Sequence, residues 1–224
     1  MLLSFLQKNC NIEEQIPNTP QERFDFYRRW VNKLPNECAN ESFLKIEDGF
    51  LIDALKEKEI FSAKKQEEMV ALKSGEAVCF EADAILAFLN DSNDKTVYLY
   101  GGTRMKKAVA DALKGKDIAV TKANNINYKG VISCILPKID LKLTSVILNN
   151  ITEKYKFALN VAKEKSLQSL VLCLPNIENL LLCSKLADAI ISTIKQHEYA
   201  KKIKLVLLAP SDTVLGVYKS KLNG

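Results

Sequence analysis

The sequence predicts a three-layer α/β/α domain with a mixed sheet, preceded by a helical extension. From about residue 66 onward, short runs of β-branched and aliphatic residues alternate with longer amphipathic segments. Two of these runs, LVLCL and KLVLLA, show no polar alternation, which is typical of strands covered by helices on both faces. We therefore expect a helical extension over residues 1–65, packed on a domain that spans residues 66–224.

The extension is expected to contain two helices. Thr19 can cap the first, Pro20 suits its first helical position, and Glu22 completes a capping box. The second is predicted across FLKIEDGFLIDALKEK, in which apolar residues recur at helical spacing. With no linker rich in Gly, Ser or Pro behind them, these helices should pack on the domain.

The domain should alternate strands and helices. The expected elements, in order, are strands at EAVCF and AILAFL, a helix across TRMKKAVADALKG after the apolar VYLY, strands at DIAVT and VISCIL, a long helix ending near AKEK, the strand SLVLCL, a helix across KLADAIISTIKQ, the strand KLVLLA and a closing helix.

Composition excludes several classes of protein. Of the 224 residues, 47% are hydrophobic and 26% are charged, a mixture that favours a folded core over disorder. The sequence contains no apolar run of membrane-spanning length and no N-terminal secretion signal, so we expect a soluble, cytoplasmic protein without membrane association. The six cysteines form no CxxC pair, which favours reduced thiols.

The net charge of +5 is spread along the chain, and no basic stripe is interleaved with aromatic residues. Nucleic-acid binding is therefore not expected. The densest basic pairs, Lys106-Lys107 and Lys201-Lys202, are interpreted as solvated helix surface.

Familiar catalytic and cofactor motifs are missing from the sequence. His197 is the single histidine, no GxSxG motif occurs, and no cysteine has a local activation signature. The sequence has neither GxGxxG nor GxxxxGK[ST]. We expect no catalytic residue, no metal site and no cofactor.

Two local features leave alternatives open. In YGGTRM, Gly101 and Gly102 precede a helix that opens with Thr103, which predicts either an anion cradle or a turn that needs a positive φ. Asp83, between two alanines at a strand entrance, could serve a site or simply a cap or turn.

The segment GEAVCFEADAILAFLN, from Gly75 to Asn90, resembles the first motif of macrodomains, which is close to GDITxLxVDAIVNAAN. This family binds ADP-ribose and often hydrolyses its linkages. Asp83-Ala84-Ile85 match DAI, Glu76 stands at the family aspartate, and Ala87 replaces the first asparagine. Later segments keep the family's order, so the resemblance covers about Val70 to Leu222.

The extension, through VNKLP and FLKIEDGFL, is similar to that of zinc-dependent bacterial macrodomain hydrolases. That branch binds zinc through a Cys/His/Cys cluster in the loop after the NAAN-like motif. Here the corresponding segment, DSNDKTVYLYGGTR, contains none of these ligands. The zinc mechanism therefore does not transfer.

The resemblance implies a set of ligand-binding residues in three groups. The resemblance places Glu76 and Ala77 at the adenine end of the ligand and Asn90 on its ribose side. It places the remaining residues in the two phosphate loops. Because bulky side chains replace the family glycines after SLVLCL, Ile177 and Leu180 are expected to obstruct a diphosphate. The implied residues are Glu76 and Ala77; Asn90; and Gly101, Gly102, Thr103, Pro175, Asn176 and Ile177.

Three functions follow as hypotheses. The first is binding of ADP-ribose or a related nucleotide, free or on an ADP-ribosylated protein, with the hydrolase machinery largely lost. The second is a non-enzymatic scaffold for a protein partner, and the third is a residual, zinc-independent protein-ADP-ribose hydrolase. The missing zinc ligands favour a protein that is not an enzyme; an active form would be an ADP-ribosyl hydrolase.

Overall fold

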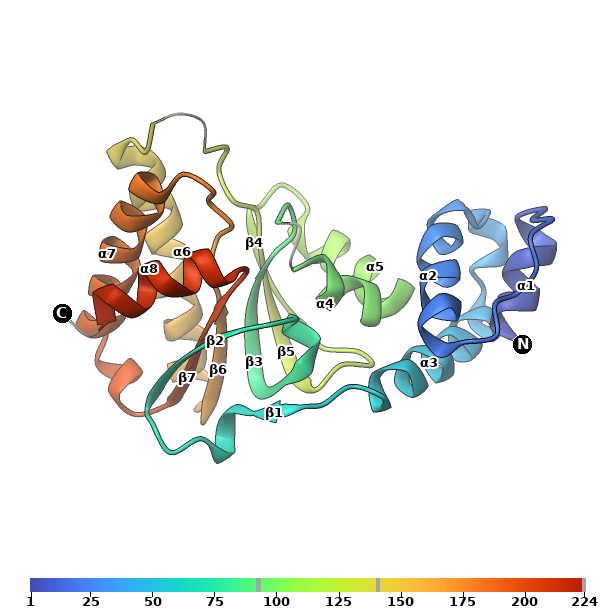
Figure 1. Cartoon of the computed structure of the whole chain (residues 1–224), viewed down its shortest axis with the longest axis horizontal. Coiled ribbons are helices and arrows are strands. Elements are labelled where there is room, and N and C mark those ends of the chain that lie inside the picture. Colours follow the sequence, from blue (N-terminus) through green and yellow to red (C-terminus); the bar gives the residue numbers. More distant parts are fainter. Residues whose placement is uncertain (92–93, 140–141, 223–224) are drawn as a thin grey trace.

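The structure is a computed structural model that describes residues 1–91, 94–139 and 142–222. Three helices come first, followed by a seven-stranded sheet with its covering helices (Figure 1). The helices are α1 (Leu2–Asn9), α2 (Pro20–Trp30), α3 (Glu41–Lys56), α4 (Lys95–Tyr100), α5 (Gly102–Leu113), α6 (Ser145–Glu164), α7 (Leu180–Gln196) and α8 (Asp212–Leu222). The strands are β1 (Phe61–Ser62), β2 (Val70–Ser74), β3 (Phe80–Phe88), β4 (Ile118–Lys122), β5 (Tyr128–Cys134), β6 (Ser169–Cys173) and β7 (Lys204–Ala209).

The main path of the sheet runs β2-β7-β6-β3-β5-β4, and β1 pairs with β3 outside that path. All pairings are parallel except β4 with β5, so the predicted mixed sheet is confirmed. Helices α6, α7 and α8 lie on the left of the sheet in Figure 1, and α4 and α5 lie on its right. The predicted three-layer arrangement is therefore present.

The strands without polar alternation are buried, as expected. Every residue of β6 is buried, and so is every residue of β7 after Lys204. Two details differ from the prediction. The EAVCF segment forms a 3-10 turn over Ala77–Cys79, and the preceding VALKS segment forms β2 instead. Because β2 lies at the edge of the sheet, half-exposed residues weaken its apolar signal.

The N-terminal helices form a second apolar cluster beside the sheet core. In α2, the Thr19 hydroxyl accepts a hydrogen bond from the Glu22 amide and Pro20 opens the helix, which confirms the predicted start. The sequence analysis missed α1, whose buried leucines complete this cluster. The ring of Phe24 on α2 stacks on Tyr100 of α4, with centroids 4.3 Å apart, so the helices pack against the domain.

The six cysteines are free thiols, three of them buried. No helix in the described part of the chain combines the length and apolarity needed to cross a bilayer.

Candidate functional site

Five parallel strands, β2, β3, β5, β6 and β7, end at the same side of the sheet, which we call the carboxyl edge. Ligands of open α/β sheets bind outside this edge, where the strand order changes direction. Glu76, Ala77 and Asn90 follow β2 and β3 directly, and Pro175–Ile177 follow β6. The structure therefore brings these sequence-predicted residues to one edge.

A small cavity lies at the carboxyl edge among the residues that the structure describes. Its volume is about 10 Å³, which is room for about one water molecule. Small-molecule sites usually occupy about 300–1,000 Å³. The cavity is lined by Gly75, Ala77, Asp94, Leu174, Leu208, Ala209 and Pro210.

Two carboxylates of the protein accept hydrogen bonds from backbone amides at this edge. Asp94 is buried and accepts a hydrogen bond of 2.6 Å from the Phe88 amide. Burial, reinforced by the charge of Asp91, raises the pKa of Asp94 from 3.8 to about 7, although the Phe88 amide and the Cys173 thiol oppose this shift. Asp91 accepts a 2.8 Å hydrogen bond from the Asn176 amide. The amide predicted to face a phosphate thus already has an acidic partner.

Two further predicted ligand residues make internal contacts. The Asn90 side chain donates to the Leu136 carbonyl at 3.0 Å and accepts from its amide at 2.8 Å, which ties the end of β3 to the segment after β5. Glu76, half-exposed, accepts a 2.7 Å hydrogen bond from Lys58. Asn90 is therefore engaged structurally, whereas the Glu76 carboxylate remains accessible.

The buried Ala77 adds a backbone contact on the same side of the sheet. Its carbonyl accepts a 2.6 Å hydrogen bond from the Tyr128 hydroxyl.

The segment after β6 divides its apolar side chains between core and solvent. Pro175 and Ile177 are buried, and Ile177 is only 7% exposed. Leu180 and Leu181, at the start of α7, are 55% and 68% exposed. Ile177 fills space at the edge as expected, but Leu180 does not obstruct it, because the first turn of α7 directs this side chain to solvent.

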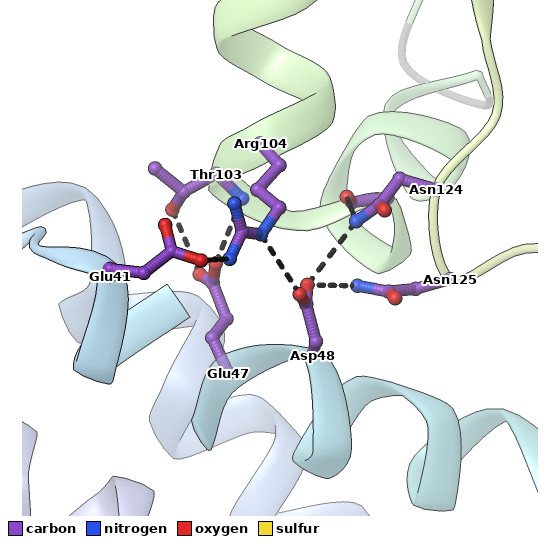
Figure 2. Close-up of polar contacts among 8 residues, drawn as sticks. Glu41, Glu47, Asp48, Thr103, Arg104, Asn124 and Asn125 are labelled. Carbon is purple, nitrogen blue, oxygen red and sulfur yellow. Dashed lines mark hydrogen bonds and ion pairs between the residues drawn. The ribbon is translucent and has the colours of Figure 1, made fainter. Parts of the chain in front are cut away.

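The predicted cradle at Gly101, Gly102 and Thr103 lies elsewhere, against α3 (Figure 2). The fully buried Glu47 accepts hydrogen bonds from the amide and the hydroxyl of Thr103, both at 2.9 Å. A helix N-terminus favours an anion, so the cradle is an anion site as its sequence suggests. This corrects the phosphate-loop prediction, because the anion is the protein's own carboxylate.

Glu47 also accepts a 2.9 Å hydrogen bond from the hydroxyl of Tyr27 on α2. Gly102 adopts a φ of +70°, so the alternative interpretation, a turn that requires positive φ, is also correct. A Cβ atom at this position would lie 2.9 Å from Leu51 and 3.2 Å from the Glu47 carboxylate. Gly102 therefore allows α3 to approach the start of α5 closely.

A second set of polar contacts surrounds this one, and the sequence analysis did not identify it (Figure 2). Arg104 pairs with Asp48 at 3.0 Å and also with Glu41. Asp48 accepts hydrogen bonds from Asn124 at 3.2 Å and Asn125 at 2.6 Å, both beyond β4. We call the contact of α3 with the start of α5 and this asparagine turn the junction.

A sequence signal for Glu47 did exist. Phe43, Glu47, Leu51 and Leu55 are spaced four residues apart, so Glu47 takes a core position on the apolar stripe of α3. A carboxylate at a core position predicts buried donors that satisfy it.

Asp83 also proves to be structural. It lies buried within β3, accepts a 2.8 Å hydrogen bond from the Gln168 amide, and pairs with Lys64 and Lys129. Burial opposes ionisation of Asp83, but the two lysines outweigh it and lower the pKa of this carboxyl group. The expected cap or turn role is replaced by an ion-paired carboxylate that joins β3 to the segment before β6.

Comparisons with known proteins agree on the architecture. No family model matches the sequence. The macro domain of ganglioside induced differentiation associated protein 2 superposes with a TM-score of 0.58 and 18% identity, covering 74% of this chain and 96% of that one. A macrodomain of Oceanobacillus iheyensis with ADP gives 0.51 and 16%, covering 73% and 87%. The chain has the macrodomain fold.

Two further comparisons extend this picture. The DarG macrodomain of Mycobacterium tuberculosis superposes with a TM-score of 0.51 at 15% identity, covering 64% of this chain and 99% of that one. Among curated proteins, a protein-ADP-ribose hydrolase of Treponema medium is 21% identical over 194 residues, covering 75% of this chain and 74% of the relative.

The zinc site of the resembled branch does not fit this macrodomain fold. The segment from Asp91 to Arg104 contains no histidine or cysteine. Among the described residues, no three His, Cys, Asp or Glu side chains are grouped to hold a metal ion. His197 lies beyond the end of α7 and contacts Asn160 of α6 at 3.1 Å. No catalytic step can therefore be derived through zinc.

Proposed function

We propose that this chain recognises ADP-ribose, or a related nucleotide, at the carboxyl edge of its macrodomain fold, without hydrolysing it. The ligand would be free or attached to an ADP-ribosylated protein. The observation that carries the proposal is the convergence of Glu76, Asn176 and the ends of five parallel strands on one edge. The similar Oceanobacillus iheyensis macrodomain with ADP supports the nucleotide class.

In this proposal the exposed Glu76 carboxylate accepts a hydrogen bond from the adenine amino group. Ala77 lies beside the base because it follows Glu76 at the end of β2. Asn176 and Ile177, after β6, would lie beside the phosphates once their segment has moved outward. Gly101, Gly102 and Thr103 take no part, because Glu47 already accepts the amide and the hydroxyl of Thr103 and the Gly101 amide donates to the Val97 carbonyl.

The proposal makes a physical demand on the protein. A cavity of about 10 Å³ cannot admit a nucleotide, so the Pro175–Ile177 segment must rearrange and Asp91 must release the Asn176 amide. That rearrangement uses part of the binding free energy. We therefore expect an affinity weaker than that of a macrodomain whose cleft is already open.

We base the proposed loss of hydrolysis on the acidic side chains at the edge, where Glu76 would be engaged by the adenine. Asp91 and Asp94 are both buried and hydrogen-bonded to backbone amides. Neither is placed to activate a water molecule in an open site, and no described metal-ligand group would do so.

Isothermal calorimetry with ADP-ribose, titrated into the whole chain up to millimolar concentration, tests the binding. We expect measurable heat for wild type and for Glu81→Ala, an exposed substitution at the other end of β3. Glu76→Ala should weaken binding about tenfold, because one hydrogen bond to a charged acceptor is removed. No heat and no thermal shift with wild type would refute nucleotide recognition.

The second candidate is a non-enzymatic scaffold for a protein partner, and the filled edge favours it. Ile177 is buried after β6, while Leu180 and Leu181 at the start of α7 stay exposed. Adjacent exposed leucines suit an apolar contact with another protein. Here wild type should capture one stoichiometric partner from cell extract, and the double substitution Leu180→Asp, Leu181→Asp should lose it while keeping the same unfolding temperature.

The residual hydrolase is tested separately. Incubation with an ADP-ribosylated protein at high concentration of this chain should leave the modification in place over hours. Release of ADP-ribose would contradict the non-hydrolytic proposal and would support the third function.

A further inference from the structure

A second cavity, which shares no lining residue with the one at the carboxyl edge, lies where the N-terminal helices meet α4 and α5. Its volume is about 380 Å³, within the range of small-molecule sites. It is lined from three helices and from the end of β3, and α2 stands beside α5 in Figure 1. Sites at the meeting of two structural units are common. We call it the basic cavity.

Three cationic side chains, each from a different helix, line the basic cavity. They are Arg28 of α2, Lys95 of α4 and Lys106 of α5. No Asp or Glu is among its described lining residues. Neither Arg28 nor Lys95 forms an ion pair with any residue that the structure describes. The lining therefore carries three positive charges that the protein itself does not neutralise there.

Lys106 is the most informative of the three. It is partly buried, and its amine donates a 3.1 Å hydrogen bond to the neutral side chain of Asn32. Burial lowers the pKa of Lys106, and the charge of Glu47 only partly opposes this. Glu47 itself is engaged by Tyr27 and Thr103. The partner of this amine is therefore a neutral amide oxygen, and no described residue forms an ion pair with it.

The remaining wall of the basic cavity is apolar. Leu89 and Leu99 are partly buried there beside Tyr98, whose hydroxyl donates to the Ala87 carbonyl at 3.3 Å. An arginine and two lysines suit a dianion such as phosphate, and arginine can bind it with two parallel hydrogen bonds. An apolar wall beside them suits the body of an ester rather than the free inorganic ion.

We propose that the basic cavity binds a small organic phosphate: a phosphate ester whose body is apolar or aromatic. Arg28, Lys95 and Lys106 hold the phosphate group, and Leu89, Tyr98 and Leu99 contact the body. Because Arg28 and Asn32 belong to the N-terminal helices, the site exists only when these helices pack on the domain. The site shares no lining residue with the cavity at the carboxyl edge and does not rest on nucleotide binding there.

Calorimetric titration of the whole chain with 1-naphthyl phosphate tests the proposal, since this probe has no adenine for the carboxyl edge to recognise. Wild type should bind it at least about tenfold more tightly than inorganic phosphate or 1-naphthol, because both parts of the cavity contribute. Lys95→Gln and Arg28→Gln should each weaken binding about fivefold or more, as one charge-assisted hydrogen bond is lost. Glu76→Ala should leave binding unchanged.

Lys107→Gln is the matched control, because Lys107 is exposed beside Lys106 but does not line the cavity. Lys106→Gln should weaken binding about tenfold, with unfolding followed in parallel because Lys106 also contacts Asn32. If that variant unfolds, the substitutions at the exposed Lys95 and Arg28 decide the test. Equal loss with Lys107→Gln, or no loss with Lys95→Gln and Arg28→Gln combined, would overturn the proposal. Binding of a Glu-rich peptide in place of the ester would also overturn it.

Discussion

The junction and the carboxyl edge both contain buried carboxylates that accept hydrogen bonds from backbone amides, but the surroundings of these carboxylates differ. Glu47 at the junction and Asp91 at the edge each accept a hydrogen bond from a backbone amide that the sequence motifs assign to a phosphate. At the junction, Glu47 is satisfied by the hydroxyls of Tyr27 and Thr103 as well as by an amide. At the edge, Asp91 accepts the Asn176 amide, while the neighbouring Asp94 accepts the Phe88 amide, and burial raises the pKa of Asp94 to about 7.

This difference indicates which of the two carboxylates is held more firmly. A carboxylate with three hydrogen-bond donors and a neighbouring arginine network joins α3 to α5 firmly. A carboxylate that changes protonation near neutral pH, beside an apolar plug, is held more weakly. If either position opens to a ligand, it should be the edge.

Breaking the junction should have the largest effect. Glu47→Ala leaves the Tyr27 hydroxyl and the Thr103 amide buried without an acceptor, which should lower the free energy of unfolding by about 2–4 kcal/mol. Urea unfolding measures it. Asp53→Ala, on the exposed side of the same helix, should change stability by less than about 0.5 kcal/mol. Similar values for the two variants would contradict the importance of the junction.

The close approach at Gly102 can be separated from its backbone conformation. Gly102 and Gly115 have φ of +70° and +73°, but only at Gly102 would a Cβ meet neighbouring atoms, the nearest being Leu51 at 2.9 Å. Gly102→Ala should therefore cost about 2–3 kcal/mol and Gly115→Ala about 1 kcal/mol. Thermal unfolding compares them. Equal costs would mean that strain of the positive φ alone decides.

Truncation of the buried Ile177 side chain should create space at the carboxyl edge. Ile177→Ala should cost about 1.5–3 kcal/mol, because a buried side chain at the rim of the core is truncated. The same variant should bind ADP-ribose more tightly than wild type, since less side chain must be displaced. Leu180→Ala, at an exposed position, should alter stability by less than about 0.5 kcal/mol. Calorimetry and urea unfolding provide both readouts, and unchanged affinity would place the obstruction elsewhere.

The effect of Asp94 should appear mainly as a dependence of stability on pH. Its pKa in the folded chain, about 7, exceeds the ordinary value of 3.8, so the folded state holds this proton more tightly than the unfolded state. That contribution is complete below about pH 3.8 and is lost as the pH rises through about 7. Asp94→Asn should flatten the stability profile over this window, measured by urea unfolding in steps of pH. A profile parallel to wild type would refute the raised pKa.

Much of the fold was predictable from local signals. The unbroken apolar runs of β6 and β7 report burial on both faces, and the Thr19–Glu22 cap marks the start of α2. These features depend only on neighbours in the chain. The edge strand β2 and the short α1 were missed because partial exposure leaves a weak pattern.

The candidate site was predictable only in part. The order of segments placed Glu76, Asn90 and Asn176 at one edge, because parallel strands end together there. Their partners, Lys58, Leu136 and Asp91, could not be read from any motif. Hydrogen bonds between distant segments depend on packing, which local sequence does not encode.

The sequence by itself determined the donor: two glycines and a threonine opening a helix create free amides that favour an anion. Only the tertiary structure determined which anion accepts the hydrogen bonds of these donors. Glu47 lies 56 residues before Thr103, and it reaches the amide because α3 packs across the start of α5. The buried Glu47 carboxylate has exchanged its water molecules for these protein donors, so an external phosphate would have to displace it from that helix end.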